Sequence, residues 1–504
     1  MPDGRGGVTT GPIRQIVVVG GGLAGWSAAV ALKRRVPSLD VTILPLAPAP
    51  DALADRIGAT LPSILGFHAD LGIGEDDAVL RTGSSYRLGS RFVGWSFDAP
   101  PYIHAYGQHG RPLPGGSFHL HWARATTQAS APPYDLFSAA AAMASDGRFA
   151  PPPDDPADPF AGYEYGLYLD LPRYTAMLHA FARHCGVREQ TVPLREVRLR
   201  GDGWIDALVL ADGSEQRGDL FLDCTGPAAM LRSKIDDRRD DWSQWLPCDR
   251  ILFATEEATT HPCPLDEVTA WAAGWRWSAT TPRSRSTGIV YASAGASDDQ
   301  AARILETMGT APADVPVAIA AGNRAEPWRG NCVAIGEAAT QVEPLEWTNL
   351  HLAHSAIDRL IAMLPDRECA TVEAADYNRQ TEAEAERVRD FLVLHYAAAR
   401  RDEPFWRDRA VALLPESLAH TLALFRERGR LPIYEEETFA RDSWLAVLFG
   451  QGVRPRRIDP LIAATPIAES QALMNRWRQA IAAGVAARPT LSTYLSHQMS
   501  QLSR

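Results

Sequence analysis

Residues 16–26 read IVVVGGGLAGW, and this stretch decides the fold. The apolar run at 16–19 is typical of a buried strand of a parallel sheet, and an alanine-rich helical pattern follows the glycines up to about Arg35. A second apolar run at 41–44 predicts the next strand, so the glycines lie in the turn of a βαβ unit, the context that the GxGxxG pattern requires. Glycine there lets the backbone approach a pyrophosphate held at the helix N-terminus. The candidate cofactor contacts in this turn are Gly20, Gly22, Leu23, Ala24 and Gly25.

The second strand ends without the acidic residue that usually binds the ribose hydroxyls of a dinucleotide. The chain reads Leu44-Pro45-Leu46 at that point, and proline has no side-chain acceptor. Two interpretations stay open: the affinity for the nucleotide is reduced, or Asp40 or Asp51 substitutes from a neighbouring position.

Length and composition exclude several classes of protein. A chain of 504 residues is too long for a short binding module, and 46% hydrophobic with 22% charged residues is ordinary for a folded protein. The net charge of −11 disfavours nucleic acid as a partner. Six cysteines without CxxC spacing predict neither a disulfide framework nor a metal site, so a reducing, cytoplasmic compartment is expected. The polar residues 1–12 have no apolar core, which predicts no signal peptide and no membrane span.

Two later segments, GDLFLDCTG (218–226) and NCVAIGEAA (331–339), are each a short apolar strand that runs into a turn of small residues. Taken singly, either strand is also typical of ordinary core. Together they resemble the later FAD-contacting segments of flavoprotein monooxygenases, and this resemblance favours FAD over NAD. It adds Gly226, Gly336 and Glu337 to the candidate cofactor contacts, with Glu337 expected to face the ribityl hydroxyls of the flavin.

The expected fold class is therefore α/β, with a division of the chain at about residue 370. Residues 1–370 are predicted to form a Rossmann-like FAD-binding domain of the glutathione-reductase type, with a mixed sheet and with substrate-binding segments inserted at about 84–175. Residues 371–504 begin with TVEAADYNRQTEAEAERVRDFLVLHY, which carries charged residues on one face and apolar residues on the other. This part is predicted to be a mainly α-helical C-terminal domain.

The whole chain resembles the flavin-dependent tryptophan halogenases. Segments similar to that family's signatures follow one another in the family's order: GGGLAGW (20–26), LPCDR (246–250), AGWRW (273–277), EPLE (343–346), RDFLVLHY (389–396), RRDEPFW (400–406) and SWLAVLFGQG (443–452). The resemblance implies FAD in its reduced form, FADH2, supplied by a separate flavin reductase. With O2, chloride or bromide is converted to hypohalous acid, which passes through the protein to an electron-rich aromatic substrate.

In the family, a lysine binds the oxidant or is halogenated by it, and a nearby glutamate assists the substitution on the aromatic ring. Glu346 stands at the position of that glutamate, whereas the alignment of GSSYRLGSRFV (83–93) puts Arg87 at the position of the lysine. The only lysines, Lys33 and Lys234, lie elsewhere in the chain. Arginine keeps the positive charge but has no amine lone pair to form a haloamine. Arg87 is a candidate catalytic residue that orients the oxidant by hydrogen bonds; the alternative is an ordinary surface or salt-bridging arginine.

The resemblance places the halide site at Thr348 and Asn349, where the family has a Thr-Gly pair that binds halide through main-chain amides. Asparagine tolerates positive φ better than most residues, so an amide nest is expected, although Trp347 in place of a small residue crowds it. The family motif GWxWxIP, whose tryptophans are taken to help prevent monooxygenation, is altered after Trp277 to Ser278-Ala279-Thr280. The alternative for its tryptophans is an ordinary role as core aromatics on a strand.

His104-Ala105-Tyr106 is similar to the family's His-x-aromatic, and Trp444 is expected to close the opposite side of an aromatic site. His104, Tyr106 and Trp444 are therefore the candidate substrate-binding residues, and their π surfaces suit an indole or another flat ring. No metal site is assigned, and a homodimer is compatible with the sequence.

Three functions stay open from the sequence. The first is an FAD-dependent oxidoreductase that modifies an indole-like substrate with reduced FAD, O2 and halide. The second is a family member that has lost catalysis and binds flavin or an aromatic ligand, which the changes at Pro45, Arg87, Ser278 to Thr280 and Asn349 suggest. The third is a flavin monooxygenase without halide chemistry.

Overall fold

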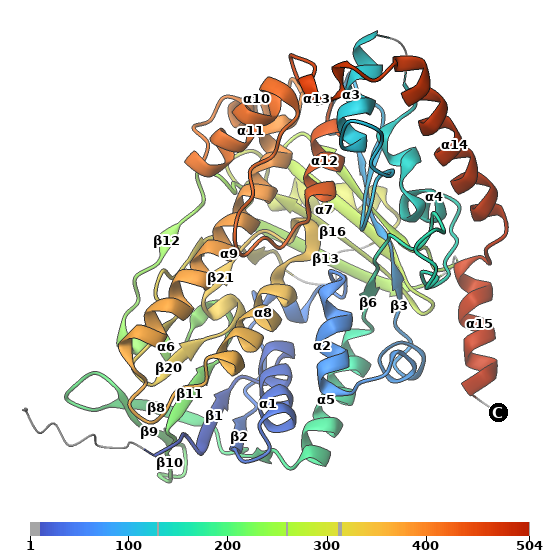
Figure 1. Ribbon diagram of the computed structural model, residues 1–504. Helices are drawn as coiled ribbons and strands as arrows, with labels where there is room; N and C mark the ends of the chain where they lie inside the picture. The colour runs from blue at the N-terminus through green and yellow to red at the C-terminus, as the bar shows by residue number, and fades with distance from the viewer. Residues whose placement is uncertain (1–10, 129–130, 259–260, 311–314, 503–504) are drawn as a thin grey trace, which may run out of the picture.

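The computed structural model describes residues 11–128, 131–258, 261–310 and 315–502 (Figure 1). Residues 1–10, on which the expectation about a signal peptide partly rests, lie outside the described residues. No helix among the described residues is both long enough and apolar enough to cross a membrane.

The first sheet has six strands in the order β19-β20-β11-β1-β2-β7. Neighbouring strands are parallel except for β19, which pairs antiparallel with β20. Their bounds are β1 Gln15–Val19, β2 Asp40–Leu44, β7 Arg188–Glu189, β11 Leu220–Asp223, β19 Trp328–Arg329 and β20 Cys332–Ala334. The strands expected at 16–19 and 41–44 are confirmed, and the two later apolar segments form β11 and β20 beside β1.

The central strand β1 is buried on both faces, which explains its continuous apolar run. Ile16 and Val18 pack in the same cluster as α1 (Leu23–Arg35) and α8 (Asn349–Ala362). Val17 and Val19 pack on the opposite side in a cluster with β9 (Ile205–Leu210), which forms a small antiparallel sheet with β8 (Leu194–Leu199) and β10 (Glu215–Gln216). Helix α5 (Leu171–Cys185) lies beside α1 (Figure 1).

The second large sheet has seven strands in the order β17-β13-β16-β15-β14-β4-β5. Their bounds are β4 Gly89–Val93, β5 Tyr102–Ala105, β13 Arg250–Glu257, β14 Leu265–Trp271, β15 Gly274–Thr280, β16 Ser284–Tyr291 and β17 Val317–Ala318. The only parallel pair described in it is β4 with β14, which sets Ser90 opposite Asp266. Strand β3 (Ser85–Arg87), which directly precedes β4 in the sequence, forms a separate two-stranded sheet with β6 (Gly166–Tyr168). In this sheet Ser85 pairs with Tyr168.

The C-terminal part is helical, as predicted from residue 371 onward. Its helices are α9 Thr371–Ala398, α10 Pro404–Ala410, α11 Glu416–Arg428, α12 Arg441–Gly450, α13 Pro460–Ala463, α14 Ile467–Ala486 and α15 Leu491–Leu502. Residues 387–396 of α9 are buried: the apolar ones pack in the core of the second large sheet, and the charged Arg387 and Arg389 pair with Asp390. Helix α14 packs against α3 (Phe118–Gln128) and α4 (Ala139–Ser145), far from it in sequence (Figure 1).

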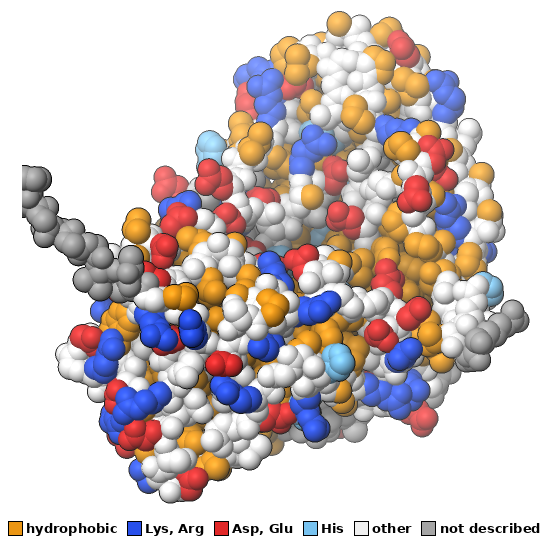
Figure 2. Space-filling model, turned by 60° about the horizontal axis from the view of Figure 1, so that its bottom comes forward, with side chains coloured by type: hydrophobic (Ala, Val, Ile, Leu, Met, Phe, Trp, Pro, Cys, Tyr) orange, Lys and Arg blue, Asp and Glu red, His pale blue; other side chains and the backbone are white. Residues whose placement is uncertain are grey.

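The remaining short elements complete the chain. They are α2 Ser63–Leu71, α6 Arg232–Ile235, α7 Asp298–Thr307, β12 Asp240–Asp241, β18 Gly322–Asn323 and β21 Thr340–Gln341. On the face shown in Figure 2, acidic and basic side chains are interspersed with apolar ones.

Candidate active site

The glycine turn lies at the carboxyl ends of β1, β11 and β20, where three segments far apart in the sequence meet. Gly20 has φ of 128°, and a Cβ there would lie 2.2 Å from the carbonyl oxygen of Cys224. A Cβ on Gly25 would lie 2.0 Å from the carbonyl oxygen of Gly20, so only glycine permits this approach of helix to strand. Gly226 and Gly336, at the turns after β11 and β20, also have positive φ.

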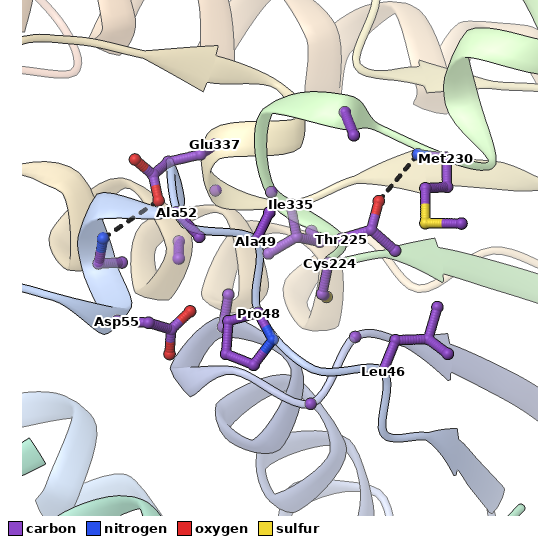
Figure 3. Close-up of a pocket in the computed structure, with 18 of the residues that line it drawn as sticks. Leu46, Pro48, Ala49, Ala52, Asp55, Cys224, Thr225, Met230, Ile335 and Glu337 are labelled. Carbon is purple, nitrogen blue, oxygen red and sulfur yellow. Dashed lines mark hydrogen bonds between the residues drawn. The ribbon is translucent and has the colours of Figure 1, made fainter. Parts of the chain in front are cut away.

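These turns enclose a cavity of about 90 Å³, here called the glycine cavity (Figure 3). Its lining includes Gly20, Ala24, Gly226, Gly336 and Glu337, five of the residues expected to contact the cofactor, together with Asn349. Gly22, Leu23 and Gly25 do not line it: Gly22 caps the N-terminus of α1, Leu23 is the first residue of that helix, and Gly25 packs against Gly20. Small side chains and a helix N-terminus are what a dinucleotide pyrophosphate requires, so the donor set fits FAD.

A carboxylate absent from the sequence predictions lies at this helix N-terminus. The backbone N–H of Leu23 donates to Oδ1 of Asp55 at 2.6 Å, and a Cβ on Gly22 would lie 2.2 Å from Oδ2. Burial raises the pKa of Asp55 to about 6, although the Leu23 hydrogen bond opposes the rise. Asp55 therefore takes the position at the end of α1 that a pyrophosphate prefers.

Glu337 binds the backbone of the two residues that precede Asp55. Its two oxygens accept from the backbone N–H groups of Leu53 at 3.0 Å and Ala54 at 3.1 Å, and burial raises its pKa to about 8. Its role toward the ribityl hydroxyls stays a prediction. The suggestion that Asp40 replaces the missing ribose ligand is wrong, because Asp40 begins β2, whereas the site lies beyond the opposite end of that strand, where Leu44 accepts from the N–H of Gly20.

A second cavity, of about 380 Å³, shares Asp55 with the glycine cavity. It is lined by residues 55–59, by Tyr168 and by Trp277 and Trp347, and is here called the tryptophan cavity. The rings of Trp277 and Trp347 lie 5.7 Å apart, edge to face. Its flat aromatic walls next to the dinucleotide turn suit an isoalloxazine ring.

Arg87 is fully buried and is not a surface arginine. Its Nε donates to Oδ1 of Asp266 at 2.6 Å, Nη2 donates to the Ser90 hydroxyl at 2.6 Å, and Nη1 donates to the carbonyl of Thr60 at 3.2 Å and to the hydroxyl of Tyr106. Four of the five guanidinium N–H groups thus have partners in the protein. Burial lowers the pKa of Arg87, but the charge of Asp266 outweighs it and raises the pKa well above the ordinary value.

Asp266 is the centre of this network. Besides Arg87, it accepts from Tyr168 at 2.6 Å, from Ser90 at 2.6 Å and from Nε1 of Trp347 at 3.2 Å. We call Arg87, Asp266, Ser90, Tyr106, Tyr168 and Trp347 the partition. Tyr168 and Trp347 line the tryptophan cavity, whereas Tyr106 lines a third cavity, so the partition separates the two.

Glu346 lies between two histidines, all three of them without exposed side-chain surface. Its Oε1 is 2.8 Å from Nδ1 of His104 and 3.1 Å from Nε2 of His395. Burial raises the pKa of Glu346, but the two histidines hold it well below the usual range, so the carboxylate is ionised and Nδ1 of His104 donates. Oε2 of Glu346 and Nε2 of His104 are buried without a partner among the described residues. Buried polar atoms without a partner are uncommon, so these two are candidates to contact a ligand.

The backbone around Glu346 corrects the expected halide nest. Positive φ occurs at Glu346 (61°) and Trp347 (62°), whereas Thr348 has φ of −85° and Asn349 is the first residue of α8. The side chain of Asn349 donates to Glu337 at 3.3 Å and to the carbonyl of Val342 at 3.2 Å. The prediction of a nest with positive φ at Asn349 is therefore wrong. The groups that can face an anion are the backbone N–H groups in the first turn of α8 and the hydroxyl of Thr348, which has no partner among the described residues.

The third cavity, of about 780 Å³, is here called the tyrosine cavity because Tyr106, Tyr163 and Tyr165 line it. Phe439 also lines it, and its ring lies 6.2 Å from that of His104. The structure does not bring Trp444 to this cavity: Trp444 lines a neighbouring one, and Phe439 lies between the two as part of both linings.

The comparisons with known proteins agree with this geometry. The family model for tryptophan halogenases matches residues 15–467. The chain belongs to the tryptophan halogenase family. It is similar to tryptophan 6-halogenase SttH of Streptomyces toxytricini, with 28% identity over 507 residues that cover 92% of this chain and 95% of SttH.

Two solved structures show how closely the fold of this halogenase-family chain follows its relatives. It is similar to BrvH, a flavin-dependent halogenase from Brevundimonas sp. BAL3, with 35% identity, a TM-score of 0.90 and coverage of 96% of this chain and 99% of BrvH. The flavin-dependent halogenase Xcc4156 from Xanthomonas campestris gives 34% identity, a TM-score of 0.89 and coverage of 96% and 98%. The mixed α/β fold is therefore confirmed, and the family implies FAD. The family uses aromatic substrates, halide and reduced flavin from a reductase.

Sequence reasoning missed three functional candidates of this halogenase-family chain. His395 lies in the quoted segment RDFLVLHY, but its contact with Glu346 depends on how α9 crosses the core. Asp266 carries no motif, because its role arises from the parallel pairing of β4 with β14. Asp55 lies in a short turn after Ala52, and nothing in that stretch indicates a contact with α1. The described residues hold no group of three or more His, Cys, Asp or Glu placed to bind a metal.

Proposed function

We propose that this protein is a flavin-dependent halogenase that modifies an aromatic, indole-like substrate with reduced FAD from a separate reductase, O2 and chloride or bromide. The observation that carries the proposal is the Glu346 carboxylate, which is ionised, held by His104 and left with one orphaned oxygen next to the partition. Glu346 does not itself line the tyrosine cavity; it is connected to it through His104, whose ring lies 5.6 Å from that of Tyr106 in the cavity lining. A fixed base near the ring is what electrophilic substitution requires, because the ring must lose a proton after the halogen adds.

The cofactor would be held by the two cavities that share Asp55. The glycine turn and the ends of β11 and β20 would bind the pyrophosphate and adenosine part, and the tryptophan cavity would bind the isoalloxazine. When bound, reduced FAD supplies with O2 the oxidising power that converts halide to an electrophilic halogen. Trp277 and Trp347 exclude water from that side of the partition, and the start of α8 with Thr348 is the place where the chain can bind halide.

Glu346 would take the ring proton at Oε2 while Oε1 stays anchored to His104. Nε2 of the second histidine, His395, lies 3.1 Å from the same Oε1 without a well-aligned hydrogen bond, and its Nδ1 lies 3.4 Å from the hydroxyl of Tyr102. Burial lowers the pKa of His395, so it acts mainly by positioning.

Arg87 would guide the oxidant through charge and through its one uncommitted N–H. Its bond to Tyr106 leaves the phenolic hydrogen of that residue free to donate toward the tyrosine cavity. A guanidinium does not form the haloamine that a lysine forms, so transfer relies on hydrogen bonds alone.

A family member that binds flavin without halogenating is the second candidate. The specific observation in its favour is the Arg87–Asp266 pair, which fills the partition with a closed hydrogen-bonded network. The two functions differ in whether a small oxidant passes that network.

Product identification decides between them. The full chain is given reduced FAD, O2 and an indole, with bromide present in one reaction and omitted in the other. A bromide-dependent mass increase with the bromine isotope doublet supports the halogenase, oxygen insertion in both reactions indicates a monooxygenase, and no product from a chain that binds reduced FAD supports the binding protein.

A further inference from the structure

The tyrosine cavity combines aromatic side chains with acidic ones. Its 19 lining residues include two acids, Glu164 and Asp442, and no lysine or arginine. Glu164 is exposed, whereas Asp442 is half-buried at the start of α12. Any ligand in this cavity therefore meets negative charge and aromatic surface together.

Neither acid has its charge satisfied by a close cation. Nε of Arg441 lies 4.0 Å from Oδ1 of Asp442, at the limit of an ion pair, and the Arg441 side chain is 57% exposed and lines the neighbouring cavity instead. Burial raises the pKa of Asp442, and the charge of Arg441 opposes that rise without cancelling it. No ion pair is described for Glu164.

The histidine in the lining does not supply a free cation either. Nδ1 of His351 lies 2.8 Å from the Ser63 hydroxyl, and Nε2 lies 3.1 Å from a carboxylate oxygen of Glu384. Both ring nitrogens are thus used within the protein.

We infer that the substrate of this site is an aromatic compound that carries a cationic amine and no carboxylate, such as an indolylalkylamine, rather than a free amino acid. This inference rests on the proposed function, since it names the class of substrate for the same site. Tyr106, Tyr163 and Phe439 would take the ring, and Asp442 and Glu164 would take the ammonium group.

A free amino acid fits this charge pattern poorly. Its carboxylate would enter a cavity with two like charges and without a lysine or arginine to pair with, and like charges at a few ångströms repel. A cavity of about 780 Å³ is also of the size that takes drug-sized ligands, which leaves room for substituents on the amine.

The test compares ligands that differ only in the charged end. Tryptamine and indole-3-propionate have the same ring and the same two-carbon chain, and indole and L-tryptophan serve as the neutral and zwitterionic members. Affinities for the full chain are measured by calorimetry at low salt without flavin or halide. Tryptamine is expected to bind about tenfold or more tightly than indole-3-propionate, the size of effect that two partly exposed charges produce. Equal affinity, or tighter binding of the propionate or of tryptophan, would overturn the inference.

Variants locate the effect in the two acids. Asp442→Asn and Glu164→Gln are each expected to reduce the ratio of the affinity for tryptamine to the affinity for indole-3-propionate. The double variant should bring this affinity ratio to about one. Asp154→Asn is the matched control, an exposed aspartate outside the lining, and should leave the ratio unchanged. A ratio that survives in the double variant contradicts the inference.

These outcomes are separate from those of the proposed function. If tryptamine binds selectively but no indole is brominated, the inference holds and the halogenase proposal fails. If indole is brominated but tryptamine and indole-3-propionate bind equally well, the halogenase proposal holds and the inference about a cationic amine fails.

Discussion

The glycine cavity and the partition lie close together, but they are built in opposite ways. The glycine cavity exists because side chains are absent: a Cβ on Gly20 or Gly25 would lie about 2 Å from backbone. The partition exists because side chains fill it, with Arg87 and Asp266 fully buried and bonded to five neighbours. The comparison shows that the first region depends on the absence of side chains, whereas the second depends on the contacts that side chains make with one another.

The largest effect is expected from a change at Gly25. Gly25→Leu would place a side chain against the carbonyl of Gly20, where even a Cβ lies at 2.0 Å, so the turn should not form and FAD binding should be abolished. Calorimetry with oxidised and with anaerobically reduced FAD measures the loss, and wild type should prefer the reduced form. Gly66→Ala is the control, since a Cβ on that exposed helical glycine meets nothing within 4 Å. Retained binding in Gly25→Leu would show that the turn does not hold the cofactor.

The second prediction breaks the partition. Arg87→Met leaves Asp266 as an unpaired buried charge and should lower the free energy of unfolding by about 3–5 kcal/mol. Adding Asp266→Asn should recover much of this, because the amide carries no charge and its one oxygen still accepts from either Tyr168 or Ser90, which bond to different oxygens of Asp266. Denaturant titration of the flavin-free chain measures both.

Arg217→Met is the matched control for this prediction. Arg217 pairs with Asp206 and Glu215 with its side chain 56% exposed, so its loss should cost far less stability than the loss of Arg87. If Arg87→Met costs no more than Arg217→Met, the partition is not held by the buried pair.

Glu346→Gln tests the base at the edge of the partition. The amide no longer accepts the ring proton, so halogenation should fall by about 10²-fold, while the affinity for reduced FAD stays unchanged. Initial rates at saturating substrate, with calorimetry for FAD, give the two readouts. Unchanged rates would remove Glu346 from the reaction.

Asp55→Asn sharpens the account of the glycine cavity. With its pKa raised to about 6, Asp55 is ionised at pH 8 and repels the pyrophosphate, whereas at pH 5 it is neutral. FAD affinity of wild type should therefore fall by up to about tenfold per pH unit between about pH 6 and 7. Across the same cavity Glu337, with a pKa of about 8, titrates mainly above this window.

The same raised pKa fixes the sign of the stability effect. Because the folded state binds the proton more tightly than the unfolded state between about pH 4 and 6, stability of the flavin-free chain should decrease as pH rises through this range. Asp55→Asn should flatten the affinity profile between about pH 6 and 7 and the stability profile between about pH 4 and 6, and should raise FAD affinity at about pH 7. Weaker binding by Asp55→Asn would instead make Asp55 a cofactor ligand.

The smallest effect is expected for Arg87→Lys. A lysine amine can be halogenated, which should raise bromination of an indole, but an ammonium paired with Asp266 stays protonated and limits the gain. Arg87→Lys with Asp266→Asn should therefore brominate faster than Arg87→Lys alone. If wild type halogenates and neither variant exceeds it, the haloamine route is unnecessary here and Arg87 is competent as it stands.

The contrast between the glycine cavity and the partition also explains which features could be predicted from the sequence. The glycine turn, β1, β2 and the helical part after residue 371 follow from local patterns, because glycine spacing and apolar periodicity report directly on backbone and burial. The partners of Arg87 could not be predicted, since Asp266 reaches it only through the pairing of distant strands. The positive φ of Glu346 and Trp347, in place of Asn349, also depends on the surrounding packing and not on residue preference.

The most direct measurement asks whether the oxidant crosses the partition inside the protein. The full chain is given reduced FAD, O2, bromide and an indole substrate, with and without a large excess of methionine in solution to destroy free hypobromous acid. Because Glu346 and the partition are buried, the account predicts a brominated product whose yield is nearly unchanged by the scavenger and falls about 10²-fold in Glu346→Gln. Product that disappears with the scavenger, or that forms equally in Glu346→Gln, would show that the oxidant leaves the protein and would contradict the account.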